Sequence, residues 1–444
     1  MEQKVMEPIV MEPKADIVII GAGAAGLMAA AGAMKILGPS AKVVVLEKMP
    51  RPSRKIMITG KGRCNFTNAK PWNEFSTHIH PKSDFLKSAF YNLTSDAMIQ
   101  YLADLGLESV VERGDRAFPV SYSAADVVDA LVKGARDSGA RIICGCEVLQ
   151  CRADNDGFVV ECSGNQDFVC SKLIVCTGGL SYPTTGSTGD GYRFAESMGH
   201  SITPLFPSLT AIVPKGYKNT SISGHIDRST PLSEMGKLLC GNQLKNVGLS
   251  LFIDGNPVQD EFGDLDFTDG GLEGPIGFKI SRRSVQALTN GAKVYVEIDL
   301  KPAVELVSLS SRINNLFDEI SKDRRSASKP YRERFRILLT KLLPSSLIPP
   351  FMKINSNLDH KSLAKALKCW RMDISGYVGY ERCVVTAGGV SRDEVVAKTL
   401  ESRIVKGLYF AGEVLDIDAD TGGYNLQSAF SMGYLAGMSA ARTI

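Results

Sequence analysis

Three glycines and one acid near the start of the chain have the spacing of a dinucleotide-binding loop. Gly21, Gly23 and Gly26 form a G-x-G-x-x-G pattern, and Glu47 follows 21 residues after the last glycine. In such loops the first glycine allows a tight turn, the second lets the backbone approach a pyrophosphate, and the third lets a helix pack on a strand. An acid at the position of Glu47 binds a ribose hydroxyl. A glycine-rich hairpin and a membrane span are disfavoured alternatives, because a span needs about 20 apolar residues.

The segments around these glycines supply the elements that must position them. Residues 17–20 form an apolar run typical of a buried strand, residues 27–37 have helical character, and residues 43–47 form a second apolar run that ends in the acid. The free N–H groups at the start of the helix would face the phosphates. The pattern therefore predicts a strand–helix–strand unit of the Rossmann type.

A second glycine-rich segment near the C-terminus indicates which dinucleotide is bound. Residues 407–413 form an apolar strand that ends in Gly412 and Glu413, and Gly422-Gly423-Tyr424-Asn425 then opens a helix. In two-dinucleotide folds such a carboxylate holds the ribityl chain, and the helix N-terminus stabilises negative charge on the reduced flavin. The segment predicts FAD, with NAD as the only cofactor as the disfavoured alternative.

The pattern of apolar residues in the rest of the chain changes from one region to the next. Residues 126–136 look helical, residues 141–151 extended, and residues 157–162 and 167–170 suggest a hairpin. Apolar residues then alternate with period two, as in antiparallel strands, before helical spacing takes over. We predict an α/β fold in which an FAD-binding Rossmann-like domain of the two-dinucleotide type (1–204 and 375–444) carries a β-rich insert (205–302) and a basic helical insert (303–374).

Two further loops combine glycines with polar or cationic side chains. One spans residues 54–68 and contains Lys55, Lys61 and Arg63, and the other spans residues 178–191. Backbone N–H groups and cations of this kind can meet phosphates or the polar edge of a flavin. A solvated basic loop is the alternative for each.

With residues 412–427, these loops make the chain resemble the BaiN/YhiN-type flavoproteins, a family of NAD(P)/FAD-dependent oxidoreductases that includes aminoacetone oxidase-like members. The resemblance begins at residue 16 and includes residues 206–211 and 267–275. The family often has His where this chain has Asp269. The Tyr-Pro-containing loop at 182–191 is also similar to fumarate-reductase-like flavoproteins.

The resemblance implies a set of cofactor-binding residues. Gly21, Gly23, Gly26 and Glu47 would hold the ADP half of FAD, and Val148 would lie near the adenine. Further residues would contact the phosphates, the ribityl chain or the flavin: Ala25, Lys48, Lys55, Thr59, Gly60, Arg63, Cys64, Thr177, Gly178, Gly179, Gly412, Glu413, Gly423, Tyr424 and Asn425.

The residue that would donate a proton in catalysis is the hardest one to identify from the sequence. Cys64 and Tyr182 are the candidate proton-bearing residues near the expected flavin face. Inert packing is the alternative for Cys64, because a buried thiol is reactive only when its pKa is perturbed. Tyr182 could instead shape the turn before Pro183. We expect no catalytic role for any of the five histidines, and no metal site, since the ten cysteines lack a CxxC pair.

Charge is distributed unevenly. The chain of 444 residues has a formal net charge of +3, whereas residues 321–374 contain 13 Lys or Arg and four Asp or Glu, a net of +9. A basic helical insert could grip phosphates, and a solvated lysine-rich surface is the alternative. Members of the resembled family have been associated with uridine reduction in large ribosomal RNA and with reduction of steroid-like enones. The segment is therefore a candidate ribosomal RNA contact.

Together these features predict an FAD-dependent oxidoreductase that reduces an activated C=C bond by hydride transfer from the flavin N5. With one dinucleotide fingerprint, NAD(P)H would bind transiently as the donor. Reduction of an RNA uridine, reduction of a small enone, amine oxidation and a non-enzymatic flavin-binding role stay open. We expect non-covalent FAD and a cytoplasmic protein, because no signal peptide or membrane span is evident. The substrate, the choice between NADH and NADPH, and the oligomeric state are not encoded in recognisable motifs.

Overall fold

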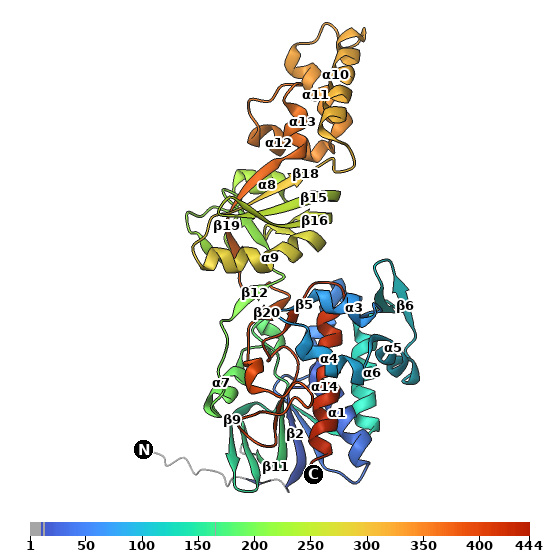
Figure 1. Cartoon of the computed structure of the whole chain (residues 1–444), viewed down its shortest axis with the longest axis vertical. Coiled ribbons are helices and arrows are strands. Elements are labelled where there is room, and N and C mark those ends of the chain that lie inside the picture. Colours follow the sequence, from blue (N-terminus) through green and yellow to red (C-terminus); the bar gives the residue numbers. More distant parts are fainter. Residues whose placement is uncertain (1–9, 12–13, 165) are drawn as a thin grey trace. The chain divides into compact units, whose positions relative to one another are not determined.

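The chain folds into two compact units in the computed structural model, which describes residues 10–11, 14–164 and 166–444 (Figure 1). Unit 1 comprises Met1–Phe206 and Val384–Ile444, and unit 2 comprises Pro207–Cys383. Residues 375–383, which the sequence placed with the nucleotide-binding domain, belong to unit 2. The reason is that β19 (Trp370–Val378) pairs along its length with strands of unit 2.

The centre of unit 1 is a sheet with a parallel core. Its main path runs β8 (Arg141–Cys144), β3 (Val43–Glu47), β2 (Ala15–Ile20) and β11 (Gln166–Val175), followed by antiparallel β10 (Gly157–Cys162) and β9 (Val148–Asp154). Strand β21 (Leu408–Phe410) also pairs with β11 in parallel. The central strands β2 and β3 are apolar and buried without alternation, as expected for parallel strands covered on both faces. The predicted extended segment 141–151 is two strands, since the chain turns at Gly145, where φ is +71°.

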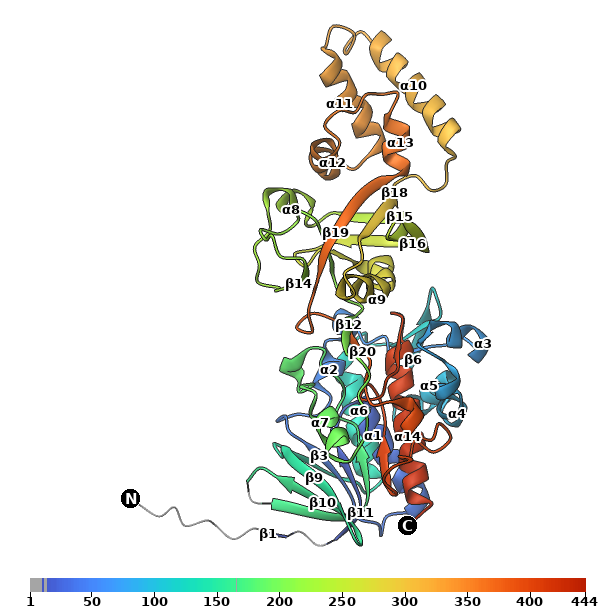
Figure 2. The same ribbon diagram turned by 60° about the vertical axis from the view of Figure 1, so that its left-hand side comes forward.

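Two helices of unit 1 pack tightly against each other, α1 (Ala24–Leu37) and α14 (Tyr424–Ala441) (Figures 1 and 2). A Cβ on Gly433 would lie 2.0 Å from the Ala25 carbonyl oxygen, and one on Gly437 would lie 2.0 Å from that of Ala29. Because residue numbers rise together along both helices, their N-termini point the same way. Ala25 is the second residue of α1 and Gly433 the tenth of α14. The N-terminus of α14 therefore extends about 12 Å beyond the N-terminus of α1, at 1.5 Å per residue.

Smaller elements surround these helices. Short strands β4 (Thr67–Asn68), β6 (Ser109–Glu112) and β7 (Arg116–Pro119) form one sheet, while β5 (Ile79–His80) pairs with β22 (Asp418–Ala419) and β12 (Phe206–Ser208) with β20 (Val385–Ala387). The other helical elements of unit 1 are α2 (Arg54–Met57), η1 (Thr59–Gly62), α3 (Trp72–Phe75), η2 (Ser76–His78), α4 (Asp84–Asn92), α5 (Ser95–Asp104), α6 (Ala124–Asp137), η3 (Pro183–Thr185), α7 (Asp190–Ser197) and η5 (Arg392–Glu394).

Unit 2 is a seven-stranded sheet with helices. The order is β13 (Ile212–Pro214), β17 (Leu272–Glu273), β16 (Asn256–Phe267), β15 (Gln243–Ile253), β18 (Val294–Asp299), β19 and β14 (Gly224–Ile226), antiparallel except for β14 with β19. Its helical elements are α8 (Glu234–Leu239), α9 (Gly274–Thr289), α10 (Leu306–Lys322), α11 (Tyr331–Leu342), η4 (Ser345–Leu347), α12 (Ile348–Ile354) and α13 (Leu363–Lys368).

The sheet and the helices α10 to α13 share one hydrophobic core. Leu309 and Ile313 of α10, Leu338 of α11 and Leu363 of α13 belong to the same buried cluster as Val296 of β18. The helical spacing seen in the sequence is borne out, but the boundary placed at residue 302 does not separate two cores. Neither amphipathic layer is wide enough to bury its apolar face without the other.

Candidate functional site

The loop before α1 uses its three glycines in three different ways. Gly21 adopts φ +98°, and a Cβ there would lie 2.6 Å from the Cys176 carbonyl oxygen. A Cβ on Gly26 would lie 1.8 Å from the Gly21 carbonyl oxygen. Gly23 has an ordinary φ of −83°, and a Cβ there would meet nothing within 4 Å. The fold itself therefore requires Gly21 and Gly26, whereas Gly23 leaves open space in front of the N–H groups of α1.

Glu47, at the end of β3, binds the backbone of this loop through its side chain. Its carboxylate accepts hydrogen bonds from the backbone N–H of Ala22 at 2.9 Å and of Met49 at 2.8 Å. Burial raises the pKa of Glu47 above its ordinary value, and the two backbone bonds oppose that shift. A carboxylate accepts about four hydrogen bonds, so lone pairs remain for the hydroxyls of a ribose.

Other residues expected on the ADP side lie near Glu47. The Cys146 N–H bonds to the Glu47 carbonyl at 3.0 Å, which brings buried Val148 to this edge of the sheet. Lys48 is bound by an ion pair to Asp190 at 2.5 Å and by a hydrogen bond to Thr188. Lys48 therefore links the segment that follows β3 to the start of α7.

Glu413 lies at the centre of a polar network that joins four chain segments. It accepts hydrogen bonds from Lys55 Nζ at 2.6 Å, from Ser181 Oγ at 2.5 Å and from the Thr386 N–H at 2.8 Å. A Cβ on Gly179 would lie 2.6 Å from Thr386 Oγ1 and 2.9 Å from Glu413 Oε1. The structure thus brings the predicted Lys55, Gly179 and Glu413 together, and Ser181 and Thr386 are members that the sequence reasoning missed.

Neighbouring residues of the two glycine loops have more local roles. Gly60 and Gly178 adopt φ values of +57° and +75°, so both are glycines for conformational reasons. Thr59 donates its hydroxyl to the Ile56 carbonyl at 2.7 Å, and the Arg63 guanidinium lies over the Phe118 ring at 5.0 Å. A Cβ on Gly191 would lie 2.1 Å from Thr177 Oγ1, so α7 begins directly against the Thr177 turn.

The two predicted proton-bearing residues differ in environment. Cys64 is fully buried, and burial raises the pKa of its thiol to about 12. A thiol with that pKa stays protonated and gives up its proton poorly, so Cys64 has the properties of a core residue. Tyr182 adopts φ +52° and immediately precedes η3, as expected if it shapes the turn.

The N-terminus of α14 is held by contacts with the loop at residues 65–68. Gly423 adopts φ +98°, and a Cβ there would lie 2.4 Å from the Thr67 carbonyl oxygen and 2.9 Å from Asn65 Oδ1. Asn68 Nδ2 donates to the Gly422 carbonyl at 3.0 Å. Asn65 Oδ1 is buried and has no hydrogen-bond partner among the described residues. A buried acceptor without a partner beside a helix N-terminus fits a site that a ligand completes.

Two residues expected to contact the flavin use their side chains inside the protein. The Asn425 amide donates to the Ala419 carbonyl at 2.7 Å and accepts from the Ala419 N–H at 2.9 Å. The Tyr424 ring is buried, with its centroid 4.9 Å from that of Phe75. Any contact of Tyr424 or Asn425 with a cofactor at this end would therefore come mainly from the backbone N–H groups of the first helical turn.

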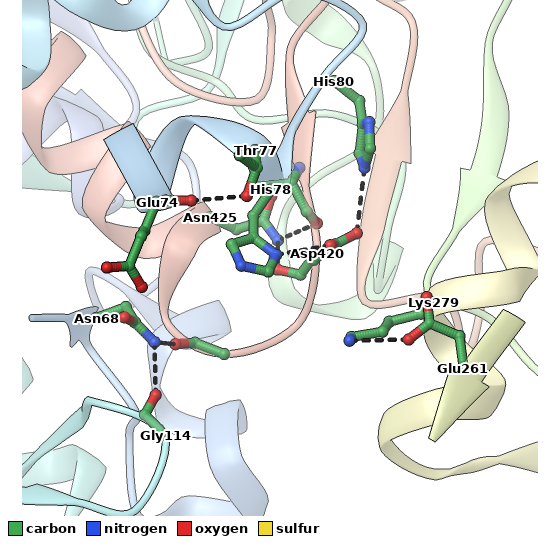
Figure 3. Close-up of polar contacts among 12 residues, drawn as sticks. Asn68, Glu74, Thr77, His78, His80, Gly114, Glu261, Lys279, Asp420 and Asn425 are labelled. Atoms are coloured by element: carbon green, nitrogen blue, oxygen red, sulfur yellow. Dashed lines mark hydrogen bonds and ion pairs between the residues drawn. The ribbon is translucent and has the colours of Figure 1, made fainter. Parts of the chain in front are cut away.

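Two histidines and an aspartate gather beside this helix start (Figure 3). His78 Nδ1 lies 2.9 Å from Asp420 Oδ2, and His80 Nε2 lies 3.1 Å from Asp420 Oδ1. The bonds from His78 and His80 outweigh burial and lower the pKa of Asp420 to about 2. Sequence reasoning missed this cluster. The only signal was a His-x-His alternation together with an acid two residues before the Gly422-Gly423 pair.

In unit 2, the departure from the family pattern is explained by an ion-pair cluster. Arg382 pairs with Asp269 at 2.5 Å and with Glu273 at 2.6 Å. Arg382 lowers the pKa of Asp269, although burial opposes the shift. An acid at this position therefore complements an arginine. Across the described residues no group of three or more His, Cys, Asp or Glu side chains is arranged so that it could hold a metal ion, and no helix is long and apolar enough to cross a membrane.

These features fit FAD. The open space at Gly23 lies before the N-terminus of α1, and the unpartnered Asn65 oxygen lies beside the N-terminus of α14, about 12 Å away along the helix axes. Glu47 binds the Ala22 N–H, and Glu413 follows Gly412, where a Cβ would lie 2.9 Å from the Ala25 Cβ, so both carboxylates lie near the start of α1. A dinucleotide is long enough to use both helix N-termini, its pyrophosphate at α1 and its flavin at α14.

Comparison with known proteins agrees with this assignment. A family model described as the HI0933-like protein Rossmann domain matches residues 15–439. The chain is 30% identical over 434 residues to the 3-dehydro-bile acid delta(4,6)-reductase of Clostridium scindens, covering 95% of this chain and 98% of the relative. It is 32% identical over 448 residues to the ribosomal RNA dihydrouridine synthase of Haemophilus influenzae, covering 97% and 100%. For the Escherichia coli ribosomal RNA dihydrouridine synthase the identity is 31% over 421 residues, covering 94% and 96%.

The family resemblance and the α/β Rossmann-like fold class predicted from the sequence are both confirmed. The chain is an FAD-dependent oxidoreductase and belongs to the HI0933-like family.

Proposed function

We propose that this oxidoreductase reduces a carbon–carbon double bond conjugated to a carbonyl group, with NADH or NADPH as a transient electron donor. The named reactions of two kinds of relative support this class. A bile acid delta(4,6)-reductase and a dihydrouridine synthase act on different molecules, but each saturates a C=C bond conjugated to C=O. The shared chemistry is therefore a better guide to this chain than either substrate.

The observation that carries the cofactor half of the proposal is the open space at Gly23. Nothing in the backbone conformation or packing excludes a side chain there. A glycine that the fold does not need is explained by a ligand that approaches the backbone closely. The Gly23 backbone and the α1 N-terminus would hold the pyrophosphate, and Glu47 would hold the ribose.

The other end of the cofactor would lie at α14. The N–H groups of the first turn and the positive end of the helix dipole favour an electron-rich ring edge there. Asn65 Oδ1 offers a free acceptor beside it, and the ion pair between Lys55 and Glu413 would contact the part of the cofactor between the two helix N-termini. When bound, FAD supplies the hydride. The residues of the chain orient the cofactor and exclude water around it.

Purification and a two-stage reaction test this proposal. The protein should be yellow, and acid precipitation should release FAD into solution, since the attachment is non-covalent. Under anaerobic conditions NADH or NADPH should bleach the flavin absorption, and a conjugated enone should restore it. A flavin that no nicotinamide reduces would favour a purely structural cofactor. A flavin bleached by amines and not reoxidised by enones would favour amine oxidation instead.

A specific observation favours RNA as a second candidate substrate. Of the cations in residues 321–374, ten are exposed and have no ion-pair partner in the described part of the chain: Lys322, Arg324, Arg325, Lys329, Arg332, Arg336, Lys341, Lys353, Lys361 and Lys365. Unpaired exposed cations on one helical region attract phosphates. The ribosomal RNA dihydrouridine synthases among the relatives agree with this candidate.

One lysine of residues 321–374 does not belong to this exposed set. Lys368 pairs with Asp299 at 2.5 Å, donates to the Lys301 carbonyl at 3.2 Å, and its side chain is only 19% exposed. It is therefore not available to a phosphate in the way that Lys361 and Lys365 are. Mapping dihydrouridine in ribosomal RNA of a strain without this gene separates the two substrates. Loss of a modified position supports RNA, and an unchanged map supports a small enone.

No disulfide joins any of the ten cysteines in the described part of the chain, as in proteins of a reducing compartment. We accordingly propose a cytoplasmic location. Fractionation of cells that express the tagged protein checks it.

A further inference from the structure

The mechanism proposed above lacks a proton donor, and the structure contains one cluster suited to the task. His78, His80 and Asp420 come from η2, β5 and the loop before α14. The pairing of β5 with β22 holds them together, with Asp418 opposite His80 and the Asp420 N–H bonded to the His78 carbonyl at 2.9 Å (Figure 3). Three groups held by backbone pairing form a preorganised constellation rather than a chance surface contact.

The cluster lies at the helix end assigned to the flavin. The His78 ring stacks on the ring of Tyr424, the first residue of α14, at a centroid distance of 4.3 Å. It is partly open, with side-chain exposures of 24% for His78, 33% for His80 and 19% for Asp420. A substrate beside the flavin could therefore reach an imidazole while the carboxylate stays shielded.

Each imidazole has one ring nitrogen that Asp420 does not bind and that could exchange a proton with a substrate. Asp420 engages Nδ1 of His78 and Nε2 of His80. The remaining nitrogen of each ring has no hydrogen-bond partner in the described part of the chain. With Asp420 held as an anion, both rings have a fixed orientation and a counter-charge for an added proton.

Other ionisable groups around the cluster are less suited to the role. Lys70 pairs with Glu74 at 2.6 Å and with Asp115 at 3.5 Å, so these three groups are engaged with one another and together carry a net charge of −1. Burial raises the pKa of the Tyr424 phenol well above its ordinary value. Asp418 is buried in β22. A group that gains and loses a proton near neutral pH is, by residue type, a histidine.

We propose that the His78–Asp420–His80 cluster donates the proton in the reduction of the conjugated C=C bond. The inference rests on the proposed function and reverses the expectation that no histidine is catalytic. The π bond breaks, one carbon gains a hydride with both electrons, and the other gains a proton from an imidazolium, which becomes a neutral imidazole. Solvent returns that proton, and a nicotinamide donor returns the two electrons. One imidazole contacts the substrate, and Asp420 is a positioning residue.

Half-reactions isolate the proton-transfer step. His78→Gln/His80→Gln should bind FAD and be bleached by NADH or NADPH as the wild type is. Reoxidation by a 3-keto-4-ene steroid, or by a uridine-containing ribosomal RNA transcript, should slow by about 10²- to 10⁴-fold. Reoxidation by ferricyanide, which needs no proton on carbon, should stay at the wild-type rate. His225→Gln, a partly exposed histidine of unit 2, is the matched control.

The role of Asp420 is tested without turnover. In ¹⁵N-histidine spectra of the full chain, with and without FAD, Asp420→Asn should change the ring-nitrogen chemical shifts of both His78 and His80, because it replaces their hydrogen-bond partner, and leave those of His225 in place. Asp420→Glu should restore part of the reoxidation rate and its pH profile. A structural role alone would lower the melting temperature without changing the pH profile.

The outcomes are separable. A wild type that reduces neither probe overturns the proposed function. A wild type that reduces one of them while the double variant reduces it equally fast overturns the proton-donor assignment. Unchanged ring-nitrogen chemical shifts of His78 and His80 in Asp420→Asn overturn the positioning role, whatever the substrate proves to be.

Discussion

The N-termini of α1 and α14 point the same way in unit 1 but are built differently. The start of α1 is organised mainly by contacts within residues 21–47, in which Gly26 packs on Gly21 and Glu47 binds the Ala22 N–H, although Gly21 also packs on Cys176. The start of α14 is organised by segments far apart in sequence, since Gly423 packs on Thr67 and Asp420 binds His78 and His80. A contiguous motif such as either glycine loop can be recognised in a sequence, whereas the side-chain contacts that distant segments make with it cannot. Four perturbations test this contrast, from the largest expected effect to the smallest.

Gly26→Ala should disrupt the packing at the N-terminus of α1 and destabilise the fold strongly. The added Cβ would lie 1.8 Å from the Gly21 carbonyl oxygen, and backbone cannot yield as a side-chain tip can. We expect a loss of about 4 kcal/mol or more in the free energy of unfolding, at the upper end of point-mutation effects. Chemical denaturation of the protein without FAD measures it. An alanine variant as stable as the wild type would show that the loop is not rigid.

Gly23→Val should separate ligand binding from folding at the same helix end. Because a Cβ there meets nothing within 4 Å, the stability of the protein without FAD should change by less than about 1 kcal/mol. FAD binding should be lost, and with it the stabilisation of about 4 kcal/mol that a ligand gives at 1,000 times its dissociation constant.

Melting temperatures of the Gly23→Val variant with and without added FAD check this prediction. The wild type should gain stability from FAD and the variant should not. A variant that binds FAD normally would place the pyrophosphate elsewhere, and one that unfolds without FAD would give Gly23 the same packing role as Gly26.

Asp420→Asn should weaken the α14 end in a pH-dependent way. The folded pKa of about 2 lies below the ordinary value of 3.8, so the carboxylate contributes stability above about pH 4 that is lost as the pH falls towards 2. A depression of this size corresponds to about 2 kcal/mol at neutral pH. Urea denaturation at several pH values should show wild type and variant converging in acid. Asp156→Asn, an exposed control, should match the wild type throughout.

The smallest effect on stability should come from the surface of unit 2. Replacing Lys341, Lys361 and Lys365 together by Gln should leave the folding free energy within about 0.5 kcal/mol, because all three are exposed. FAD content and nicotinamide oxidation should not change. If RNA is the substrate, each lost phosphate contact should make the log–log salt dependence of binding shallower by about 0.7 to 0.9.

Filter binding to ribosomal RNA fragments at two salt concentrations measures the triple variant. The matched control replaces the exposed Lys87, Lys398 and Lys406 of unit 1 by Gln. Equal binding by both triple variants, or no binding by the wild type, would make the basic insert an ordinary solvated surface.

Much of the architecture could be predicted because it depends on local spacing. The strand–glycine loop–helix unit, the alternating strands around Val247 and Val294, and the apolar faces of α10 and α11 all follow from periodicity and glycine placement. Domain boundaries were less predictable. Strand β19 follows a helical segment and precedes a glycine motif, and only its pairing with β18 and β13 places it in unit 2.

The sequence by itself determined the cofactor class, because the two glycine motifs and their carboxylates have fixed spacings along the chain. Tertiary structure alone decided how the individual residues are used. It distinguished Gly23, which leaves open space, from Gly26, which packs on backbone, and it tied Lys368 to Asp299. It also joined His78 and His80 to Asp420 across about 340 residues. Local spacing records which conformation the backbone takes, whereas the partner of a polar side chain depends on segments that only the folded chain brings together.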